Sequence, residues 1–217
     1  MEILVRSVNV GMPSVIAVQR GEAILSGIRK APLETETVFV SALGIAGDGQ
    51  ADLTVHGGID KAVYAYPSEH WPWWEREHKL SCAPNTFGEN LTLEGADESD
   101  VAIGDRFRWG EVVLEISQPR SPCFKLGIHA REDIPALMTG SARCGWYMRV
   151  LVEGKAPVRC GKLTRIVSTG GPNVRETFLA HHRARADLET LHRIHEAPAL
   201  SRSWRESFAR KIAAITG

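Results

Sequence analysis

The sequence lacks the features that assign a chain to export, to a membrane or to nucleic acid. Its 26 Lys and Arg residues balance 26 Asp and Glu residues, so no net charge draws it to nucleic acid or to an anionic membrane. The first residues show no basic region followed by an apolar one, which is the pattern of a secretory signal. The longest mainly apolar stretch, 38–46, is far shorter than the roughly 20 residues that span a bilayer. We therefore expect a cytoplasmic protein that binds no membrane and no nucleic acid stably.

Cysteine pairs and nucleotide-binding fingerprints are also missing. The four cysteines are widely spaced and include no Cys-x-x-Cys pair: Cys82, Cys123, Cys144 and Cys160. This spacing is untypical of a structural zinc site, of a plant-type [2Fe–2S] site and of a disulfide framework. No Gly-x-Gly-x-x-Gly or Gly-Lys-Ser/Thr pattern occurs, which argues against a dinucleotide or nucleoside-triphosphate loop. We expect reduced thiols, and any redox chemistry would need electrons from another protein.

Short strands dominate the first 167 residues. β-branched and aromatic runs alternate with glycine turns, and residues 61–66 form one such run. The segment 106–116 predicts a hairpin that turns at Gly110, and 147–155 predicts a second hairpin that turns at Gly154. Many short strands favour a barrel or a sandwich.

Two helices are predicted among these strands. One covers residues 68–80, where Pro72 is acceptable only in the first turn, and the other covers roughly 131–139. The first helix contains three tryptophans that we expect to pack in the core, because aromatic side chains bury large areas: Trp71, Trp73 and Trp74.

The pattern becomes helical after residue 167. Asn173 with Glu176, and Ser203 with Glu206, have the spacing of capping boxes. One helical stripe contains Trp204, Phe208, Ile212 and Ile215. We predict a β domain over residues 1–167, followed by three short helices over residues 168–217.

Cys123 has the most reactive surroundings of the four cysteines. Two prolines stiffen its loop, and Arg120 and Lys125 stand close to it in sequence. Neighbouring cations favour the thiolate, which attacks electrophiles and ligates metals. The alternative is a buried cysteine that acts as a small apolar residue, and we expect this of the other three. A nucleophilic pair of Cys123 with His56 or His129 is a further possibility.

Two glycine-containing segments could border a ligand. Gly57 and Gly58 would let backbone amides approach a phosphate, while His56, Asp60 and Lys61 add charge; the same residues could form a simple turn. The other segment, 44–49, has a single acid and is expected to be a loop rather than a phosphate site.

Four segments, taken in order, resemble the MOSC family, named for the carboxy-terminal domain of molybdenum cofactor sulfurases. They are HGGIDKAVYAYP (56–67), FGENLT (87–92), PRSPCFKL (119–126) and CGWYMRV (144–150). The similarity is to the bacterial branch linked to resistance to N-hydroxylated base analogues, and it spans nearly the whole chain because that branch also carries a three-helix tail. It implies a mainly β fold with peripheral helices, in which a MOSC-type β-barrel is followed by a small three-helix subdomain.

The resemblance also implies a site for the molybdenum cofactor, molybdopterin with its metal. Cys123 matches the position that binds molybdenum, and Asn90 would hydrogen-bond near the pterin or the metal and share the catalytic role. Cations would contact the cofactor's phosphate, and the planar fork of Arg120 suits it better than Lys61 does. The expected cofactor-binding residues are Cys123, Arg120, Lys61, His56, Asn90 and Lys125.

The activity implied by the resemblance is reduction of hydroxylaminopurines and amidoximes, with electrons supplied by a separate flavin or iron–sulfur reductase. A second interpretation is a binding module that carries the cofactor or activated sulfur on Cys123 without turnover, as the family's namesake domain assists sulfuration. The sequence contains no pyridoxal-phosphate desulfurase domain, which favours the reductase. A purely structural role is the remaining alternative.

Overall fold

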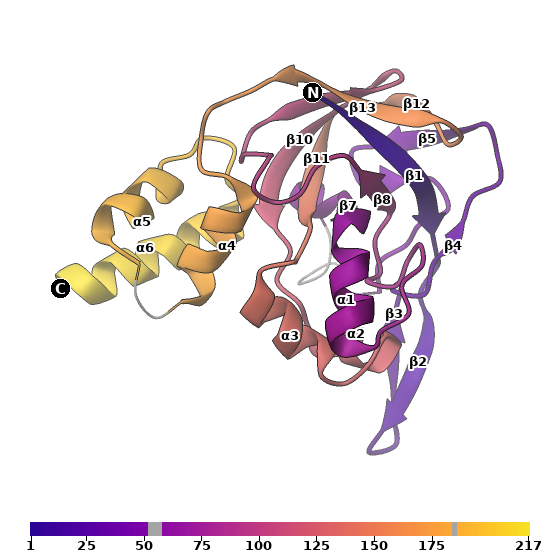
Figure 1. Ribbon diagram of the computed structural model, residues 1–217, viewed down its shortest axis with the longest axis horizontal. Helices are drawn as coiled ribbons and strands as arrows, with labels where there is room; N and C mark the ends of the chain where they lie inside the picture. Colours follow the sequence, from indigo (N-terminus) through magenta and orange to yellow (C-terminus); the bar gives the residue numbers. More distant parts are fainter. Residues whose placement is uncertain (52–57, 184–185) are drawn as a thin grey trace.

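A closed barrel forms the centre of the computed structural model, which describes residues 1–51, 58–183 and 186–217 (Figure 1). The strands of its main sheet are β1 (Glu2–Val10), β4 (Ala31–Pro32), β7 (Val63–Pro67), β8 (Leu91–Glu94), β9 (Arg106–Trp109), β10 (Val112–Pro119), β11 (Trp146–Val152) and β13 (Gly161–Val167). They follow the order β13-β9-β10-β11-β7-β8-β1-β4, and pairing of β1 with β13 closes the ring. The β7–β8 pair is parallel, and the other pairings in this sheet are antiparallel. The predicted mainly β barrel is thus confirmed.

Two smaller β structures adjoin the barrel. One sheet contains β5 (Thr37–Ser41), β6 (Gly44–Ile45) and β12 (Gly154–Pro157), and the other is the hairpin of β2 (Ser14–Gln19) and β3 (Glu22–Ser26). Figure 1 shows this hairpin projecting from the lower end of the molecule.

One predicted hairpin is confirmed and the other is wrong. Trp109 pairs with Val112 across Gly110, whose φ of 62° suits the tight turn. After β11, however, β12 pairs with β5 and not with β11. β10 pairs with one edge of β11 as far as Val152, and β7 pairs with the other edge only at 146–148; after Val152 the chain leaves this sheet, because its next residues pair with β5 instead.

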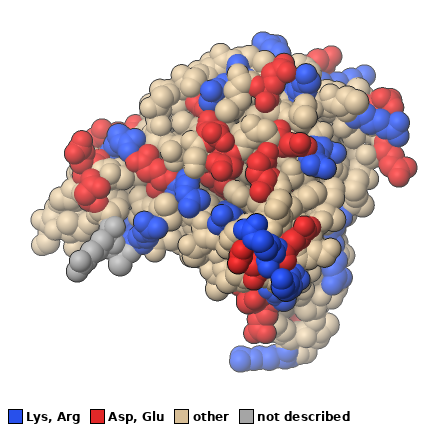
Figure 2. Space-filling model, viewed as in Figure 1, with Lys and Arg blue, Asp and Glu red and all other residues tan. Residues whose placement is uncertain are grey.

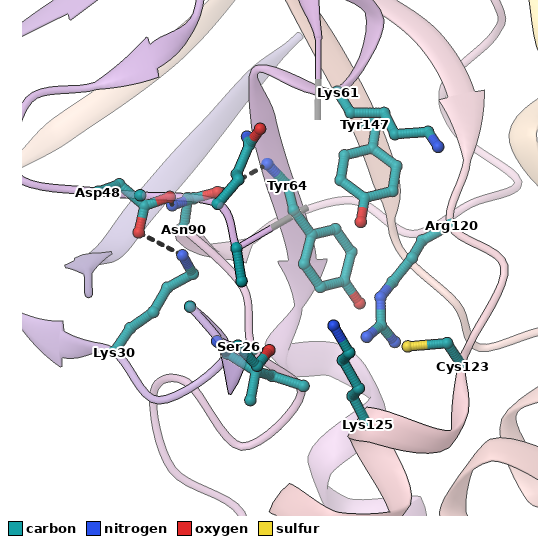
Figure 3. Close-up of a pocket in the computed structure, with 16 residues that line it drawn as sticks. Ser26, Lys30, Asp48, Lys61, Tyr64, Asn90, Arg120, Cys123, Lys125 and Tyr147 are labelled. Atoms are coloured by element: carbon teal, nitrogen blue, oxygen red, sulfur yellow. Dashed lines mark hydrogen bonds and ion pairs between the residues drawn. The ribbon is translucent and has the colours of Figure 1, made fainter. Parts of the chain in front are cut away.

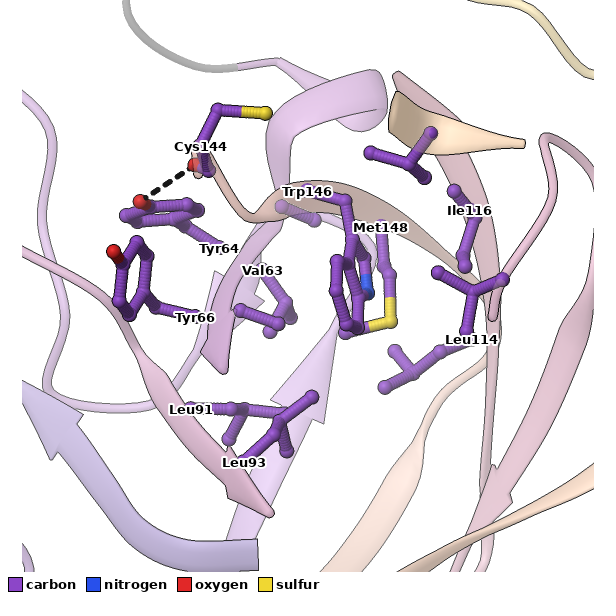
Figure 4. Packing of buried hydrophobic residues seen from close by; sticks show 14 of the residues in the cluster. Val63, Tyr64, Tyr66, Leu91, Leu93, Leu114, Ile116, Cys144, Trp146 and Met148 are labelled. Atoms are coloured by element: carbon purple, nitrogen blue, oxygen red, sulfur yellow. Dashed lines mark hydrogen bonds between the residues drawn. The ribbon is translucent and has the colours of Figure 1, made fainter. Parts of the chain in front are cut away.

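Apolar side chains fill the barrel (Figure 4). The interior residues labelled there come from four strands: Val63, Leu91, Leu93, Leu114, Ile116, Trp146 and Met148. Trp74 is fully buried, and its indole Nε1 donates a hydrogen bond to the Tyr66 hydroxyl at 2.6 Å. Trp71 and Trp73 are half-buried against the same core, so the expected packing of the three tryptophans is confirmed.

The helices within the barrel domain are η1 (Ile59–Lys61), η2 (Ser68–His70), α1 (Trp71–His78), α2 (Phe124–His129) and α3 (Ile134–Ser141). The helix predicted over 68–80 is η2 followed by α1, and Pro72 lies in the first turn of α1. The second predicted helix corresponds to α3, displaced by two to three residues, with Pro135 in its first turn. The short α2 was missed. Among the described helices, none is long and apolar enough to cross a membrane.

Three helices follow β13: α4 (Val174–His182), α5 (Leu188–His195) and α6 (Arg202–Thr216), as predicted. The Asn173 side chain accepts a hydrogen bond from the Glu176 amide, which confirms the first capping interaction. The second is wrong, because Ser201 and not Ser203 caps α6. The Ser201 amide donates to the Ser117 carbonyl of β10 at 3.0 Å, which fixes the start of the helix there.

The apolar stripe of α6 is only partly covered. Trp204 and Phe208 are buried, Ile212 is half-buried and Ile215 is exposed. Figure 1 shows the carboxy-terminal end of α6 extending away from the barrel, so its last turn lies beyond the packed part of the helix.

Charges on the face drawn in Figure 2 are intermixed. This face therefore shows no extended patch of one sign. Exposed ion pairs of the protein, such as Arg6 with Glu94 at 3.0 Å, contribute roughly 0–1 kcal/mol each.

Candidate functional site

A pocket collects polar side chains from segments far apart in the chain (Figure 3). The ten labelled residues that line it are Ser26, Lys30, Asp48, Lys61, Tyr64, Asn90, Arg120, Cys123, Lys125 and Tyr147. Five of the six residues predicted from the sequence are among them. The sixth, His56, lies outside the described residues.

Cys123 enters the pocket from the start of α2. It is the N-cap residue of that helix, with extended backbone angles of −122° and 168°, and its side chain is half-buried. The Arg120 amide donates to the Gly145 carbonyl at 3.2 Å, which ties this loop to the segment before β11. Figure 3 shows the Arg120 guanidinium turned toward the Cys123 sulfur. A cation at this place suits a thiolate, the form of cysteine that ligates metals.

Arg120 is a buried cation without a carboxylate partner among the described residues. Its exposed fraction is 5%, and none of the ion pairs found there includes it. Its guanidinium lies 4.8 Å from the centre of the Tyr64 ring, and Nη1 lies 3.5 Å from the Met138 sulfur. Burial acts to lower the pKa of Arg120, but Tyr64, Tyr147 and Cys123 outweigh it, and the pKa lies above its ordinary value. The guanidinium therefore keeps its charge in the folded protein, and with no described carboxylate beside it this position can bind an anionic ligand.

Lys30 and Asp48 form a second polar cluster in the pocket. The Lys30 ammonium pairs with the Asp48 carboxylate, and both side chains are almost fully buried. Asp48 also accepts hydrogen bonds at 2.9 Å from the Gly11 amide and from Asn90 Nδ2. Burial lowers the pKa of Lys30, although Asp48 opposes this shift. Sequence reasoning missed both residues, because they stand 18 positions apart in segments without a recognisable motif.

The side-chain amide of Asn90 is committed largely to the protein. Its Oδ1 accepts from the Tyr64 amide at 3.1 Å, and its Nδ2 donates to the Asn9 carbonyl at 3.2 Å as well as to Asp48. These bonds fix the start of β7 and orient Asp48. A ligand contact by Asn90 would use the remaining acceptor capacity of Oδ1.

Cations outnumber carboxylates in this pocket. Lys61 ends the short helix η1, and burial lowers its pKa while Asp60 opposes the shift. The Lys125 ammonium donates to the Leu25 carbonyl at 3.0 Å. The described lining thus contains four cationic side chains (Lys30, Lys61, Arg120 and Lys125) against the single carboxylate of Asp48. Such a lining concentrates anions.

A tight turn before β8 brings Asn90 to the pocket. The fully buried Glu89 carboxylate accepts from the amides of Asn85 at 2.7 Å and Phe87 at 3.0 Å, and from the Thr92 hydroxyl at 2.9 Å. Burial raises the pKa of Glu89, and these hydrogen bonds oppose the rise. Gly88 has a φ of 78°, and a Cβ there would lie 2.5 Å from Ile28. Glu89 therefore stabilises the turn and does not line the pocket.

The hydrolase alternative with His129 finds no support in the geometry. Its Nε2 lies 3.0 Å from the Asn85 carbonyl oxygen, and His129 does not line the pocket. Within the described parts of the chain, no cluster of three or more His, Cys, Asp or Glu side chains could hold a metal.

The other cysteines lie away from the pocket lining. Burial raises the pKa of Cys82 to about 12 and holds the pKa of Cys144 well above its ordinary value, whereas Cys160 is exposed. Cys144 behaves as a small core residue, as expected, and Cys82 packs half-buried against the core; the expectation is wrong for Cys160, whose position outside the core leaves it exposed.

Comparisons with known proteins match both parts of the chain. Residues 52–165 match the family model of the MOSC domain, and residues 174–214 match that of the YiiM-like, 3-alpha helix domain. The uncharacterized protein YflK of Bacillus subtilis is 39% identical over 211 residues, which cover 95% of this chain and 93% of that protein. Protein YiiM of Escherichia coli is 38% identical over 191 residues, which cover 86% of this chain and 84% of that protein. A protein of Gibberella moniliformis named "Reductase" is 39% identical over 124 residues, 54% of this chain but 22% of that protein.

Solved structures agree with these matches. The crystal structure of YiiM from Geobacillus stearothermophilus superposes with a TM-score of 0.80 at 32% identity, covering 97% of this chain and 99% of that one. YiiM from Escherichia coli gives a TM-score of 0.80 at 31% identity, covering 100% and 94%. Because the similarity extends over the barrel and the carboxy-terminal helices, the chain belongs to the MOSC domain family and carries a YiiM-like three-helix domain.

Proposed function

We propose that this protein is a molybdenum-cofactor-dependent reductase of N-hydroxylated compounds, such as hydroxylaminopurines and amidoximes, and that a separate flavin or iron–sulfur reductase supplies its electrons. The observation that carries the proposal is the buried guanidinium of Arg120, which has no carboxylate partner among the described residues and is turned toward Cys123. This arrangement places a cation that can bind an anion beside a thiol that can ligate a metal.

The residues present fit this cofactor. Thiolate is a soft ligand, so Cys123 would hold the metal. The phosphate of the cofactor would contact Arg120, Lys61 and Lys125. We expect Arg120 to bind it most strongly, because the planar guanidinium can donate two charge-assisted hydrogen bonds to phosphate oxygens. When bound, the molybdenum cofactor supplies two-electron transfer of an oxygen atom, while the protein provides orientation and electrostatics.

The reaction needs protons as well as electrons. An N-hydroxyl compound, R–NHOH, takes up two electrons and two protons and yields R–NH2 and water. Lys30 lines the pocket, and burial lowers its pKa. A lysine with a lowered pKa releases its proton more readily than a solvated one, so this ammonium group, which is not assigned to the phosphate, is suited to hold a proton for the departing oxygen.

The name of one relative agrees with the reaction class. This relative is named "Reductase", and its match covers 54% of this chain. Since that match covers only 22% of the relative, it supports reduction in general and leaves substrate and electron donor to experiment.

The test is turnover by cofactor-loaded protein from a host that makes molybdopterin. With a chemical reductant, we expect the loaded protein to convert a hydroxylaminopurine to the amine, measured by chromatography. With NADH or NADPH alone we expect no product, because the sequence shows no nucleotide-binding fingerprint. Loaded, reduced protein that yields no amine from purine or amidoxime substrates would contradict the reductase and favour carriage of the cofactor or sulfur on Cys123. Turnover by the lone chain with NADPH would contradict the separate reductase.

A further inference from the structure

Arg149 on β11 connects the carboxy-terminal helices to the turn that carries Lys61. Its Nε donates to the Asp60 carboxylate at 3.0 Å, and its Nη1 donates to the Glu115 carboxylate at 2.7 Å. Its Nη2 donates to the Ala199 carbonyl at 2.9 Å, in the connection between α5 and α6. One guanidinium thus holds the pocket turn and the helical tail together.

Ser117 on β10 makes a parallel connection. Its hydroxyl lies 2.5 Å from the Asp60 carbonyl and 3.0 Å from the Tyr147 carbonyl, and the side chain is completely buried. Its own carbonyl accepts a hydrogen bond from the Ser201 amide at 3.0 Å. Residues 199–201 therefore contact the same two residues that hold Asp60: Arg149 through its guanidinium, and Ser117 through its backbone carbonyl.

These polar contacts are what position the turn. The short helix η1 contains no buried residue, and its Ile59 side chain is exposed, so its own side chains add no buried apolar contact; the core begins at Ala62, the residue after it. Its internal bond runs from the Lys61 amide to the Gly58 carbonyl at 3.0 Å. The bonds to Asp60 from Arg149 and Ser117 hold the turn against β10 and β11, and the next residue, Lys61, lines the pocket.

We propose that Arg149 is a positioning residue for the pocket. By binding the Asp60 carboxylate, Arg149 sets the position of the Lys61 ammonium, and the 199–201 connection in turn holds Arg149. The three-helix tail is then part of the scaffold of the site. The inference rests on the proposed function only for the identity of the anion that Lys61 meets.

A matched control lies in the same charge cluster. Arg106 donates from Nε to the other oxygen of Glu115 at 2.8 Å, and its recorded contacts include neither Asp60 nor residues 199–201. Arg106→Gln removes a cation from Glu115 as Arg149→Gln does, but it leaves the connection between tail and turn intact.

The first test follows hydrogen exchange in the protein without cofactor. Loss of a charge-assisted bond should speed local opening by about 10-fold or more. We expect this acceleration at the Lys61 and Ser201 amides in Arg149→Gln, and a change of less than about 2-fold in Arg106→Gln. Unchanged exchange at Lys61 in Arg149→Gln, or equal acceleration in both variants, would overturn the proposal. Should Arg149→Gln fail to fold, Arg149→Lys is expected to show the same local pattern more weakly.

The second test is a double-mutant cycle, read as the dissociation constant of the isolated molybdenum cofactor. Lys61→Gln should weaken binding by roughly 10-fold or more, and Arg149→Gln should weaken it measurably. If Arg149 acts through Lys61, the double variant binds within about 2-fold of Lys61→Gln alone. Losses that multiply in the double variant would contradict the positioning role. If the unmodified protein binds no cofactor, the proposed function fails, while hydrogen exchange still decides the role of Arg149.

Discussion

Replacing Arg120 by methionine should stabilise the protein without cofactor and weaken its binding of the cofactor. Exchanging a buried charged group for an apolar one of similar volume is often neutral or stabilising by roughly 1–4 kcal/mol. The lost stacking on Tyr64 opposes this by about 0.5–2 kcal/mol. The central values leave a net gain of about 1 kcal/mol, which for a chain of this length raises Tm by roughly 2–4 °C. The lost charge-assisted bond should weaken cofactor binding by roughly 10- to 150-fold.

The assay compares thermal and urea unfolding of cofactor-free protein with cofactor affinity of the same preparations. Arg76→Met serves as the control, because Arg76 is exposed and pairs with Glu77 on the surface. Its stability should change by less than about 1 kcal/mol, and its affinity for the cofactor should not change. An Arg120→Met protein that is less stable than the parent and binds the cofactor equally well would show that the protein itself compensates the buried charge, and the reasoning would be refuted.

Three further predictions concern the framework. Glu89→Gln places an amide NH2 donor against buried backbone amides and should lower the free energy of unfolding by about 1–3 kcal/mol. The control Glu94→Gln, at an exposed residue, should lower it by less than about 1 kcal/mol. Equal losses of both variants in urea unfolding would contradict the structural role of Glu89. Gly88→Ala should lower the free energy of unfolding by about 1–3 kcal/mol, because position 88 has a positive φ and a Cβ there would contact Ile28. In the control Gly140→Ala the new Cβ meets nothing within 4 Å, and the free energy of unfolding should rise by about 0.5–1 kcal/mol. A Gly88→Ala protein as stable as the parent would contradict the strain. Burial lowers the pKa of His181 from 6.5 to about 4, so the folded state resists protonation of this side chain. The free energy of unfolding should therefore fall as the pH drops from 6.5 to 4, and it should fall less in His181→Phe. Parallel curves of stability against pH for the two proteins would show that His181 does not cause the fall.

Local chemistry made much of the fold predictable. The hairpin around Gly110 follows from two apolar runs and one residue that tolerates positive φ, and the first tail helix follows from the Asn173 cap. Arg120, Cys123 and Lys125 could be grouped from sequence because they stand on one short stretch stiffened by prolines.

Contacts between distant segments account for what sequence reasoning missed. No local signal predicts that β12 pairs with β5, because the two strands are far apart in the sequence. The segment 44–49 was expected to be a plain loop, yet its Asp48 meets Lys30 and Asn90 at the pocket. The cap of α6 is Ser201 because of a bond to Ser117, far away in sequence.

The central claim is that Cys123 holds a molybdenum cofactor in the cationic pocket. The most direct measurement is the molybdenum and pterin content of the purified protein and of Cys123→Ser, both made in a host that synthesises molybdopterin, with the exposed Cys160→Ser as control. We predict stoichiometric molybdenum in the unmodified and Cys160→Ser proteins and its loss from folded Cys123→Ser. Full molybdenum occupancy in Cys123→Ser, or none in the unmodified protein, would contradict the account.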